Sequence, residues 1–539
     1  MPPRPTGRRS ACGRPYRVRS SRTGRPGVTG SLAELDAALA VAGGHPEVHP
    51  AILGLVQHNR SQLLLRTGRL REARDGFRAA SVTLQRSGAG SVAYPLTGLG
   101  EAYELSGAPL PARASYEEAV EVATTAGNAQ ALVPALSGLA RVLAALGDDA
   151  ALPVAQQALA GATGLTAAVA EAAAGWAALA AGDRGAAAAH ADRTLELARG
   201  QRNFTALAEG LELAAMAGGP VGAPQRLSDA AAMWKDVGDP VSQARVVLAK
   251  ARFEGRPAEV VAEDRLRTLG SDPASGTRSL AGRLHAAPVV RVLGTFTVLL
   301  NGRTVPVASW QSRKARDLLK VLVARRGRPA TREALGELLW PGEESVANRL
   351  SITLSVLRKV LDPDRRAPAD TYVVADAAGV RYDPANLRVD VDGFLHLVTA
   401  GAAAARAGRA EEARILYEAA VDAYTGEVLD DEPDLAPVVP LRDEARAAFL
   451  AAARALGELR AAAGDVDGAV SAWLRLLEAD PYDEDCSLRL IALLAGTGRH
   501  GEAARHHHRY AGRMRELGAP VVPLARVRTV RGHTDVPAR

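Results

Sequence analysis

Leucine positions in residues 346–363 follow the spacing of an α-helix that buries one face. The stretch reads VANRLSITLSVLRKVLDP, and Leu350, Leu354, Leu357 and Leu361 recur at i, i+4, i+7 and i+11. Residues at this spacing share one side of a helix. The other positions carry mainly small polar and cationic side chains, with no carboxylate before the last leucine. Such a helix suits the major groove of DNA, but a solvated amphipathic helix has the same pattern.

The segments around this helix predict a winged helix-turn-helix with an added N-terminal sheet. Asn301 and Gly302 form a hairpin-turn signal between two β-branched runs. Ser312 and Thr331 suit the N-caps of the two preceding helices. Strands, three helices and a final hairpin are expected in the order 289–300, 304–307, 312–326, 331–340, 346–363, 372–375 and 380–383. This order favours the DNA-binding interpretation over the solvated helix.

Residues 31–265 are expected to be almost entirely helical and to repeat. Gly68, Gly107, Gly147 and Gly182 are separated by 39, 40 and 35 residues. The residues five positions further on are Ala73, Ala112, Leu152 and Ala187. Such periods indicate helical hairpins that stack into a solenoid, because one hairpin cannot bury its apolar face alone. The segment 234–253 is interpreted as a final, degenerate helix pair.

The second of these repeats resembles the tetratricopeptide family. The positions that carry the resemblance are Leu99, Gly100, Tyr103, Gly107, Ala112, Tyr116 and Ala119. Trp176 and Trp234 are interpreted as packing residues. The resemblance implies a concave surface that binds a protein or peptide, while a purely structural array remains the alternative.

Residues 388–525 again predict helices, at 391–405, 411–424, 440–463, 466–479, 483–494 and 502–517. Leu456, Gly457, Gly464, Ala469, Trp473 and Pro481 fall in tetratricopeptide register. The fold class is therefore expected to be mainly α: a tetratricopeptide-like α-solenoid, a winged helix-turn-helix of α+β type, and an all-α tetratricopeptide-like domain. The expected boundaries are a disordered leader at 1–30, repeats at 31–265, a linker at 266–287, the winged helix at 288–387, the last domain at 388–525 and a disordered tail at 526–539.

Composition and charge narrow the possible functions. Hydrophobic residues make up 47% of the chain and aromatic residues only 4%, which favours helices over sheets. Only two cysteines are present, so a reducing cytoplasm is expected. No signal peptide or apolar run of about 18 residues is found, so no membrane is expected as a partner. Residues 289–386 hold sixteen basic and ten acidic side chains, which predicts a local polyanion site.

The stretch 289–386 resembles the OmpR-type DNA-binding domain. In particular, GRPATREALGELLWPGEESVANRLSITLSVLRKVLDP is similar to the Streptomyces antibiotic regulatory protein (SARP) family. The helical segment after it resembles the bacterial transcriptional activation domain that follows the winged helix in that family. The resemblance implies that the third helix enters the major groove and that the wing lies against the DNA backbone. Val356 departs from the basic residue often found at its position.

Candidate DNA-binding residues are assigned by role. Arg349, Ser351 and Asn348 are expected to read base edges, because Arg pairs with guanine and Asn with adenine. Phosphate contacts are expected from Arg313, Lys314, Arg316, Arg358 and Lys359. Ser355 is included because it matches the family pattern, and Arg381 because it lies in the expected wing.

No residues indicate an enzyme, a cofactor or a metal site. The sequence has no glycine followed by Lys-Ser or Lys-Thr, so it lacks the phosphate loop of the ATPase module that similar regulators often carry. His506, His507 and His508 are consecutive, so a helix directs them differently, and they are expected to be solvated.

The expected protein is a cytoplasmic, nucleoid-associated transcriptional regulator that binds double-stranded promoter DNA. The family resemblance implies activation of secondary-metabolite genes and recruitment of RNA polymerase. Further expected partners are an unknown protein or peptide at the N-terminal repeats and a second protomer in a homodimer on DNA. The alternatives are a tetratricopeptide scaffold with weak DNA binding, or a repressor on the same fold.

Overall fold

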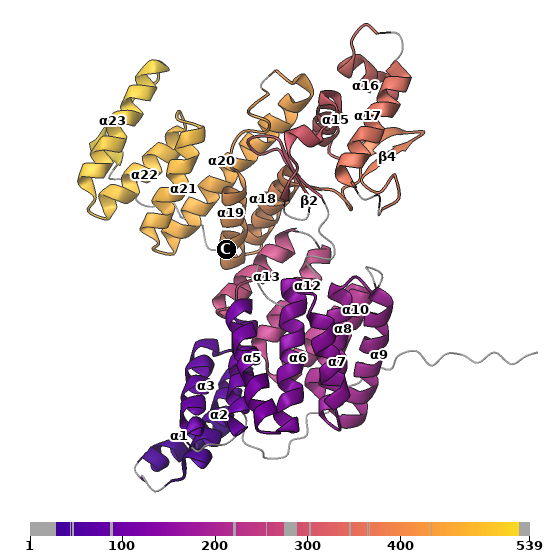
Figure 1. Ribbon diagram of the computed structural model, residues 1–539. Coiled ribbons are helices and arrows are strands. Elements are labelled where there is room, and N and C mark those ends of the chain that lie inside the picture. Colours follow the sequence, from indigo (N-terminus) through magenta and orange to yellow (C-terminus); the bar gives the residue numbers. More distant parts are fainter. Residues whose placement is uncertain are drawn as a thin grey trace, which may run out of the picture.

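The computed structural model describes residues 28–527, except for 44, 46–47, 87–89, 219–221, 255, 274–287, 301–302, 344–345, 364, 366 and 433. Within these residues, a helical array is followed by a small α+β unit and by further helices (Figure 1). The expected mainly α fold class is confirmed. The expected leader before residue 28, most of the expected linker, the turn at Asn301 and Gly302, and the tail after residue 527 lie outside the described residues.

The N-terminal array consists of antiparallel helices that pack against their neighbours in sequence. Their bounds are α1 (Val28–Gly43), α2 (Pro50–Arg66), α3 (Leu70–Gln85), η1 (Gly90–Val92), α4 (Ala93–Leu105), α5 (Pro109–Thr125), α6 (Ala129–Leu146), α7 (Ala151–Gly161), α8 (Thr166–Ala180), α9 (Arg184–Gln201), α10 (Phe204–Ala217), α11 (Ala223–Val237), α12 (Pro240–Glu254) and α13 (Arg256–Thr268). The pair α11–α12 is not the last one, because α13 follows it and ends inside the expected linker. By length and composition α6 could cross a membrane, but 72% of its apolar window is buried inside the array.

Small residues allow the close helix contacts that the repeat pattern predicts. The Tyr116 ring is 1% exposed, and a Cβ added at Gly100 or Gly138 would lie within 2.8 Å of it. Both tryptophans singled out in the sequence are buried, Trp176 at 2% and Trp234 at 4% exposure. Leu152 was expected to occupy the position that alanines occupy in the other repeats. This expectation is wrong, because the Leu152 side chain is 38% exposed. The first turn of α7 instead buries Ala151, so the third repeat is shifted by one residue.

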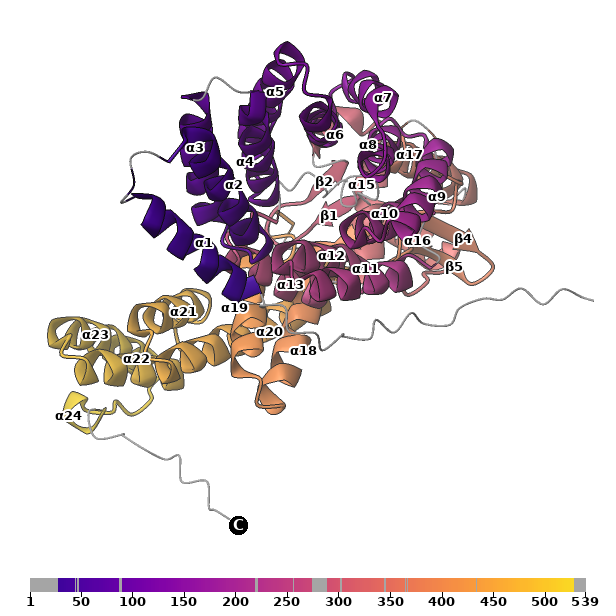
Figure 2. The same ribbon diagram turned by 90° about the horizontal axis from the view of Figure 1, so that it is seen from below.

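The array closes on itself, which the repeat pattern did not predict. One buried apolar cluster joins α2, α3 and α4 at the start of the array with α12 and α13 at its end; its members include Leu64, Phe77, Leu99, Val241, Leu248 and Leu266. Beyond α13, the Ser271 hydroxyl donates to the Leu105 carbonyl at 2.6 Å, and the Asp272 amide donates to the Ser106 carbonyl at 3.2 Å. Figure 2 shows the helices arranged as a ring, with α12 and α13 beside α2. We call residues 266–273 the clasp.

A buried polar network connects helices across the inner side of the ring. Arg141 on α6 donates to Glu104 on α4 at 3.2 and 3.3 Å, and the Tyr116 hydroxyl donates to the same carboxylate at 3.0 Å. Arg141 also lies 3.9 Å from Glu209 on α10, which accepts from the Trp176 indole at 3.2 Å. These groups satisfy one another in a buried setting, where an unpaired charge would be costly. The network therefore specifies how α4, α6, α8 and α10 pack.

Four short strands form the sheet of the α+β unit. Their bounds are β1 (Val289–Arg291), β2 (Thr297–Leu300), β3 (Arg303–Thr304) and β6 (Arg388–Val389), in the order β3-β2-β1-β6. β1 and β2 are antiparallel, whereas β6 joins β1 in parallel. The expectation of one strand over 289–300 is wrong, because the chain turns at Gly294 with φ of 90°. There the amide of Gly294 donates to Glu427 in the C-terminal part instead of continuing a strand.

Three helices and a hairpin complete the winged helix-turn-helix. Their bounds are η3 (Val307–Ser309), α15 (Arg313–Ala324), α16 (Arg332–Leu339), α17 (Val346–Leu361), β4 (Val373–Asp376) and β5 (Gly379–Tyr382). Thr331 caps α16 by accepting from the Ala334 amide at 3.2 Å, whereas Ser312 makes no side-chain cap bond. Ala330 exchanges backbone hydrogen bonds of 2.8 and 2.9 Å with Val380, so the hairpin is tied to the start of α16.

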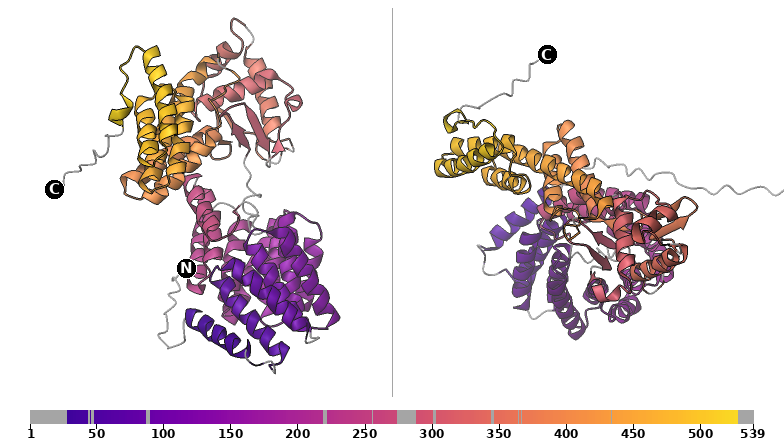
Figure 3. Two further views of the ribbon diagram at one scale, coloured as in Figure 1. Left: turned by 90° about the vertical axis from the view of Figure 1, so that its left-hand side faces the viewer. Right: turned by 90° about the horizontal axis from the view of Figure 1, so that it is seen from above.

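The six expected C-terminal helices begin and end within two residues of their expected bounds. They are α18 (Asp390–Arg406), α19 (Ala410–Ala423), α20 (Val439–Ala462), α21 (Val466–Ala479), α22 (Glu484–Gly496) and α23 (His500–Glu516). Two short helices, η4 (Ala436–Val438) and α24 (Leu524–Val527), were not expected. Trp473 packs on Gly457, where an added Cβ would lie 2.1 Å from the indole nitrogen. These helices and the winged helix share one continuous apolar core. Figure 3 shows both lying together at one end of the molecule, away from the ring.

Gly107→Ala should release the clasp, and Gly147→Ala provides a matched control. Both glycines end helices with φ of 77° and 72°, so an alanine costs about 1 kcal/mol of backbone strain at either position. Only at Gly107 would the added Cβ also lie 2.8 Å from the Asp272 carbonyl oxygen. Hydrogen exchange of residues 266–273 should therefore accelerate in Gly107→Ala alone. Equal protection of the clasp in both variants would contradict the closure.

Candidate nucleic-acid interface

The buried face of α17 is the leucine stripe that the sequence predicts. Leu350, Leu354, Leu357 and Leu361 are at most 4% exposed and belong to the core shared with the C-terminal helices. Thr353 and Val360 widen this face. The helix is thus held by apolar packing along one side, and the residues on the other side are not needed for this packing.

The side of α17 opposite the leucines is a single exposed row. Asn348, Ile352, Ser355 and Lys359 are spaced i, i+4, i+7 and i+11 and are all exposed. We call them the outer row. Within the described residues, the side chains of Asn348, Ser355 and Lys359 make no hydrogen bond or ion pair. Ile352 is 59% exposed, which is unusual for a large apolar side chain. Ile352 is not among the DNA-binding residues expected from the sequence, although its spacing from Asn348 is a usable signal.

Arg349 and Ser351 flank the outer row on opposite sides. Arg349 is ion-paired with Glu343, in the turn that precedes α17, and its side chain is 51% exposed. The Ser351 hydroxyl donates to the Ala347 carbonyl at 3.0 Å, which leaves its oxygen as an acceptor. Both residues therefore lie beside the face that points outward, and Arg349 must exchange its carboxylate partner to contact another group.

Arg358 holds the wing in the structure. Its guanidinium donates to the Val373 carbonyl in β4 at 3.0 and 3.3 Å and also pairs with Asp370. Arg381 in β5 similarly pairs with Asp376 at 2.8 Å. This hydrogen bond holds the pKa of the Asp376 carboxyl below its usual value, helped by the Ala378 amide. Both arginines have intramolecular partners, which the sequence analysis did not anticipate for residues assigned to DNA.

The first turn of α15 carries basic side chains where a helix favours acidic ones. Arg313 is exposed and Lys314 is half-buried, and neither makes a hydrogen bond or ion pair among the described residues. The Arg316 guanidinium lies 5.7 Å from the centre of the Phe296 ring. Positive charge at a helix N-terminus opposes the helix dipole. An anion bound there would interact favourably with both the side chains and the free amides.

Three contacts fix the winged helix on the C-terminal helices. Lys320 on α15 is 1% exposed, pairs with Glu432 and lies 5.0 Å from the centre of the Phe296 ring. Arg326 bridges Asp392 at 3.0 Å and Glu444 at 2.8 Å. The members of these pairs are 66 to 118 residues apart in the chain. They fix the orientation of α17 relative to the helices that follow.

Comparison with known proteins assigns the C-terminal part. Residues 389–529 match the family model for the bacterial transcriptional activator domain. The transcriptional regulatory protein EmbR of Mycobacterium tuberculosis, and that of Mycobacterium bovis, is 31% identical over 222 residues, or 40% of this chain. The chain spans 56% of the length of these relatives.

Two solved structures are also similar. EmbR of Mycobacterium tuberculosis in complex with a low-affinity phosphopeptide is 28% identical, with a TM-score of 0.38, covering 44% of this chain and 63% of that one. The Rap protein complexed with competence and sporulation factor is 16% identical, with a TM-score of 0.35, covering 45% and 75%. Residues 389–529 are thus similar to the bacterial transcriptional activator domain, and part of the chain is similar to a transcriptional regulatory protein.

Arg358→Ala should loosen the wing, and the neighbouring Lys359→Ala should leave it unchanged. Removing the guanidinium leaves the Val373 carbonyl without its donor, at a cost of about 1 kcal/mol, because the arginine side chain is 27% exposed. Hydrogen exchange across residues 370–382 should therefore accelerate in the first variant only. Unchanged exchange in Arg358→Ala would show that this arginine does not hold the wing.

Proposed function

We propose that the protein is a transcriptional regulator that places α17 in the major groove of promoter DNA. The single observation that supports this most strongly is the outer row, which combines an amide, a hydroxyl, an ammonium and an exposed aliphatic side chain opposite a fully buried face. An amide suits adenine, an aliphatic side chain suits the thymine methyl group, and an ammonium suits phosphate or guanine. In this proposal Asn348, Ile352 and Ser355 contact base edges, with Arg349 and Ser351 beside them.

The proposed phosphate contacts come from three elements around α17. Arg313 and Lys314 start α15, Lys359 ends the outer row, and Arg381 lies in β5. Arg316 is partly committed to the Phe296 ring, and Arg358 mainly positions the wing. Support for a polyanion partner comes from the net charge of +6 over residues 289–386. A groove-reading helix flanked by backbone-positioning cations is the usual division of roles in such domains.

The proposal extends to the rest of the chain through the family match. The C-terminal helices would recruit RNA polymerase, and the targets would be secondary-metabolite genes, as the SARP resemblance implies. The ring would bind a protein or peptide, and two protomers would occupy adjacent sites on DNA in the cytoplasm. Transcription assays with purified RNA polymerase separate an activator, which raises the amount of transcript, from a repressor, which lowers it. A scaffold protein would leave the amount of transcript unchanged.

Lys359→Ala should weaken DNA binding equally for all sequences. Loss of one phosphate contact reduces the slope of log K against log salt concentration by about 1. The measurement is fluorescence anisotropy of a labelled duplex from a genome-wide footprint of the protein, over a salt series. Arg505→Ala is the control, because Arg505 is an exposed arginine on α23, far along the chain from the winged helix. An unchanged slope in Lys359→Ala would remove this residue from the interface.

Asn348→Ala should relax sequence specificity and leave the salt slope almost unchanged. A lost bidentate contact to a base costs about 1–3 kcal/mol on the cognate duplex and nothing on unrelated DNA. The comparison uses the footprint duplex, single-base variants of it and a scrambled duplex. If the variant lost affinity for the scrambled duplex as well, Asn348 would be a backbone contact and the groove assignment of the outer row would be wrong.

A further inference from the structure

A hollow of about 180 Å³ opens between α21 and α23, with α22 as its floor. Its apolar part is formed by Leu474 and Leu477 on α21 and by Leu490 on α22. Leu474 is 38% exposed, so an apolar surface is accessible at the rim. Pockets for drug-sized molecules measure about 300–1,000 Å³, so this one is suited to a side chain or two of another protein.

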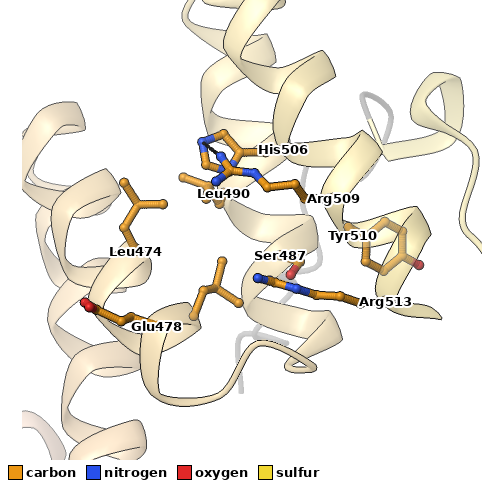
Figure 4. Close-up of a pocket in the computed structure, with 9 residues that line it drawn as sticks. Leu474, Glu478, Ser487, Leu490, His506, Arg509, Tyr510 and Arg513 are labelled. Carbon is orange, nitrogen blue, oxygen red and sulfur yellow. Dashed lines mark hydrogen bonds between the residues drawn. The ribbon is translucent and has the colours of Figure 1, made fainter. Parts of the chain in front are cut away.

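Two guanidinium groups line the hollow and have no carboxylate partner among the described residues. Figure 4 shows Arg509 and Arg513 extending from α23 across the hollow toward α21, whereas the Tyr510 hydroxyl points away. Among the described residues, Arg509 contacts only the His506 ring, at 3.1 Å, and Arg513 donates only to the Pro481 carbonyl, at 2.9 Å. The other N–H groups of both arginines remain available to an acceptor.

Two other arginines near the hollow are paired with carboxylates. Arg499, at the start of α23, bridges Glu502 at 2.8 Å and Asp467 at 2.6 Å, and Arg489 on α22 bridges Asp485 at 2.7 Å. Arg509 and Arg513, by contrast, face the hollow and have no ion pair among the described residues. Glu478 also lines the hollow, and neither Arg509 nor Arg513 is ion-paired with it.

The charge of the hollow comes from these two arginines and Glu478. Burial lowers the pKa of the His506 imidazole, and the positive charge of Arg509 lowers it further. Ser487 on the floor adds a hydroxyl whose oxygen makes no hydrogen bond among the described residues. The net charge facing a ligand is therefore positive, beside an apolar wall.

We propose that this hollow binds an acidic, leucine-bearing segment of a partner protein: a carboxylate on Arg509 and Arg513, and an adjacent aliphatic side chain against Leu474 and Leu477. The bidentate geometry of guanidinium and carboxylate favours this acceptor. A nucleic-acid backbone would use the arginines but not the apolar wall. The proposal concerns the C-terminal helices alone and does not depend on DNA binding by α17.

The test is fluorescence anisotropy of the full-length protein with a fluorescein-labelled peptide of about twelve residues that alternates Leu with Asp and Glu. Arg509→Glu and Arg513→Glu should each weaken binding about tenfold or more, because each places like charges together. Arg505→Glu is the matched control on the same helix, and it should change affinity by less than about twofold because exposed charges act weakly. Glu478→Gln should tighten binding, since it removes a repelling carboxylate.

A further variant and a further peptide distinguish specific binding in the hollow from loss of folding and from non-specific electrostatic attraction. Leu474→Asp alters an already exposed side chain on a different helix and should also abolish peptide binding. A peptide with Lys in place of the acids should bind only the Arg509→Glu/Arg513→Glu double variant. Equal losses in Arg505→Glu, or no peptide binding by the wild-type protein, would overturn the proposal. Scrambled duplex DNA that competes with the peptide, and loses affinity in the same variants, would assign the hollow to nucleic acid instead.

Discussion

The junction at Asp390 holds the winged helix and the C-terminal helices together. β6 pairs with β1, and the next residue begins α18, so the sheet of the winged helix continues into the C-terminal domain without a linker. The Asp390 carboxylate accepts from the Val292 amide at 2.9 and 3.0 Å and from the Leu293 amide at 3.1 Å. Burial raises the pKa of this carboxyl, although these backbone bonds oppose the shift. Because the bonds are charge-assisted and buried, they fix the sheet on α18.

Helix α13 connects the ring to this rigid end. It packs against α18 and α19, and its Val260 belongs to the core that the winged helix shares with them. Its buried Glu259 lies 3.2 Å from Arg256 and 3.9 Å from Arg388 in β6. The same helix leads into the clasp on α4. A change in the ring that moved the clasp would therefore act directly on the helix that contacts the C-terminal domain, without a separate relay.

Sequence patterns predicted the local structure of this chain well, and its long-range contacts poorly. The leucine stripe, the Thr331 cap and the C-terminal helices follow from periodicity and capping, which involve neighbouring residues only. The turn at Gly294 and strand β6 depend on partners near residues 388 and 427, which no local pattern reveals. The candidate site shows the same difference between local patterns and long-range contacts. The exposed outer row was readable from the sequence, whereas the partners of Arg358 and Arg349 became visible only in the fold.

Pairing distinguishes cations that stabilise the fold from cations available to a partner. Arg326 and Arg358 satisfy carboxylates or carbonyls, and removing either would leave an acceptor unmatched. Neither Arg313 nor Lys359 makes a side-chain hydrogen bond or an ion pair among the described residues, and the charge on Arg313 opposes the dipole of α15. Residues that lower the stability of the fold and make no compensating contact are expected at functional surfaces. By this criterion the first turn of α15 and the outer row are both available to a partner, because each presents charge that is unmatched among the described residues.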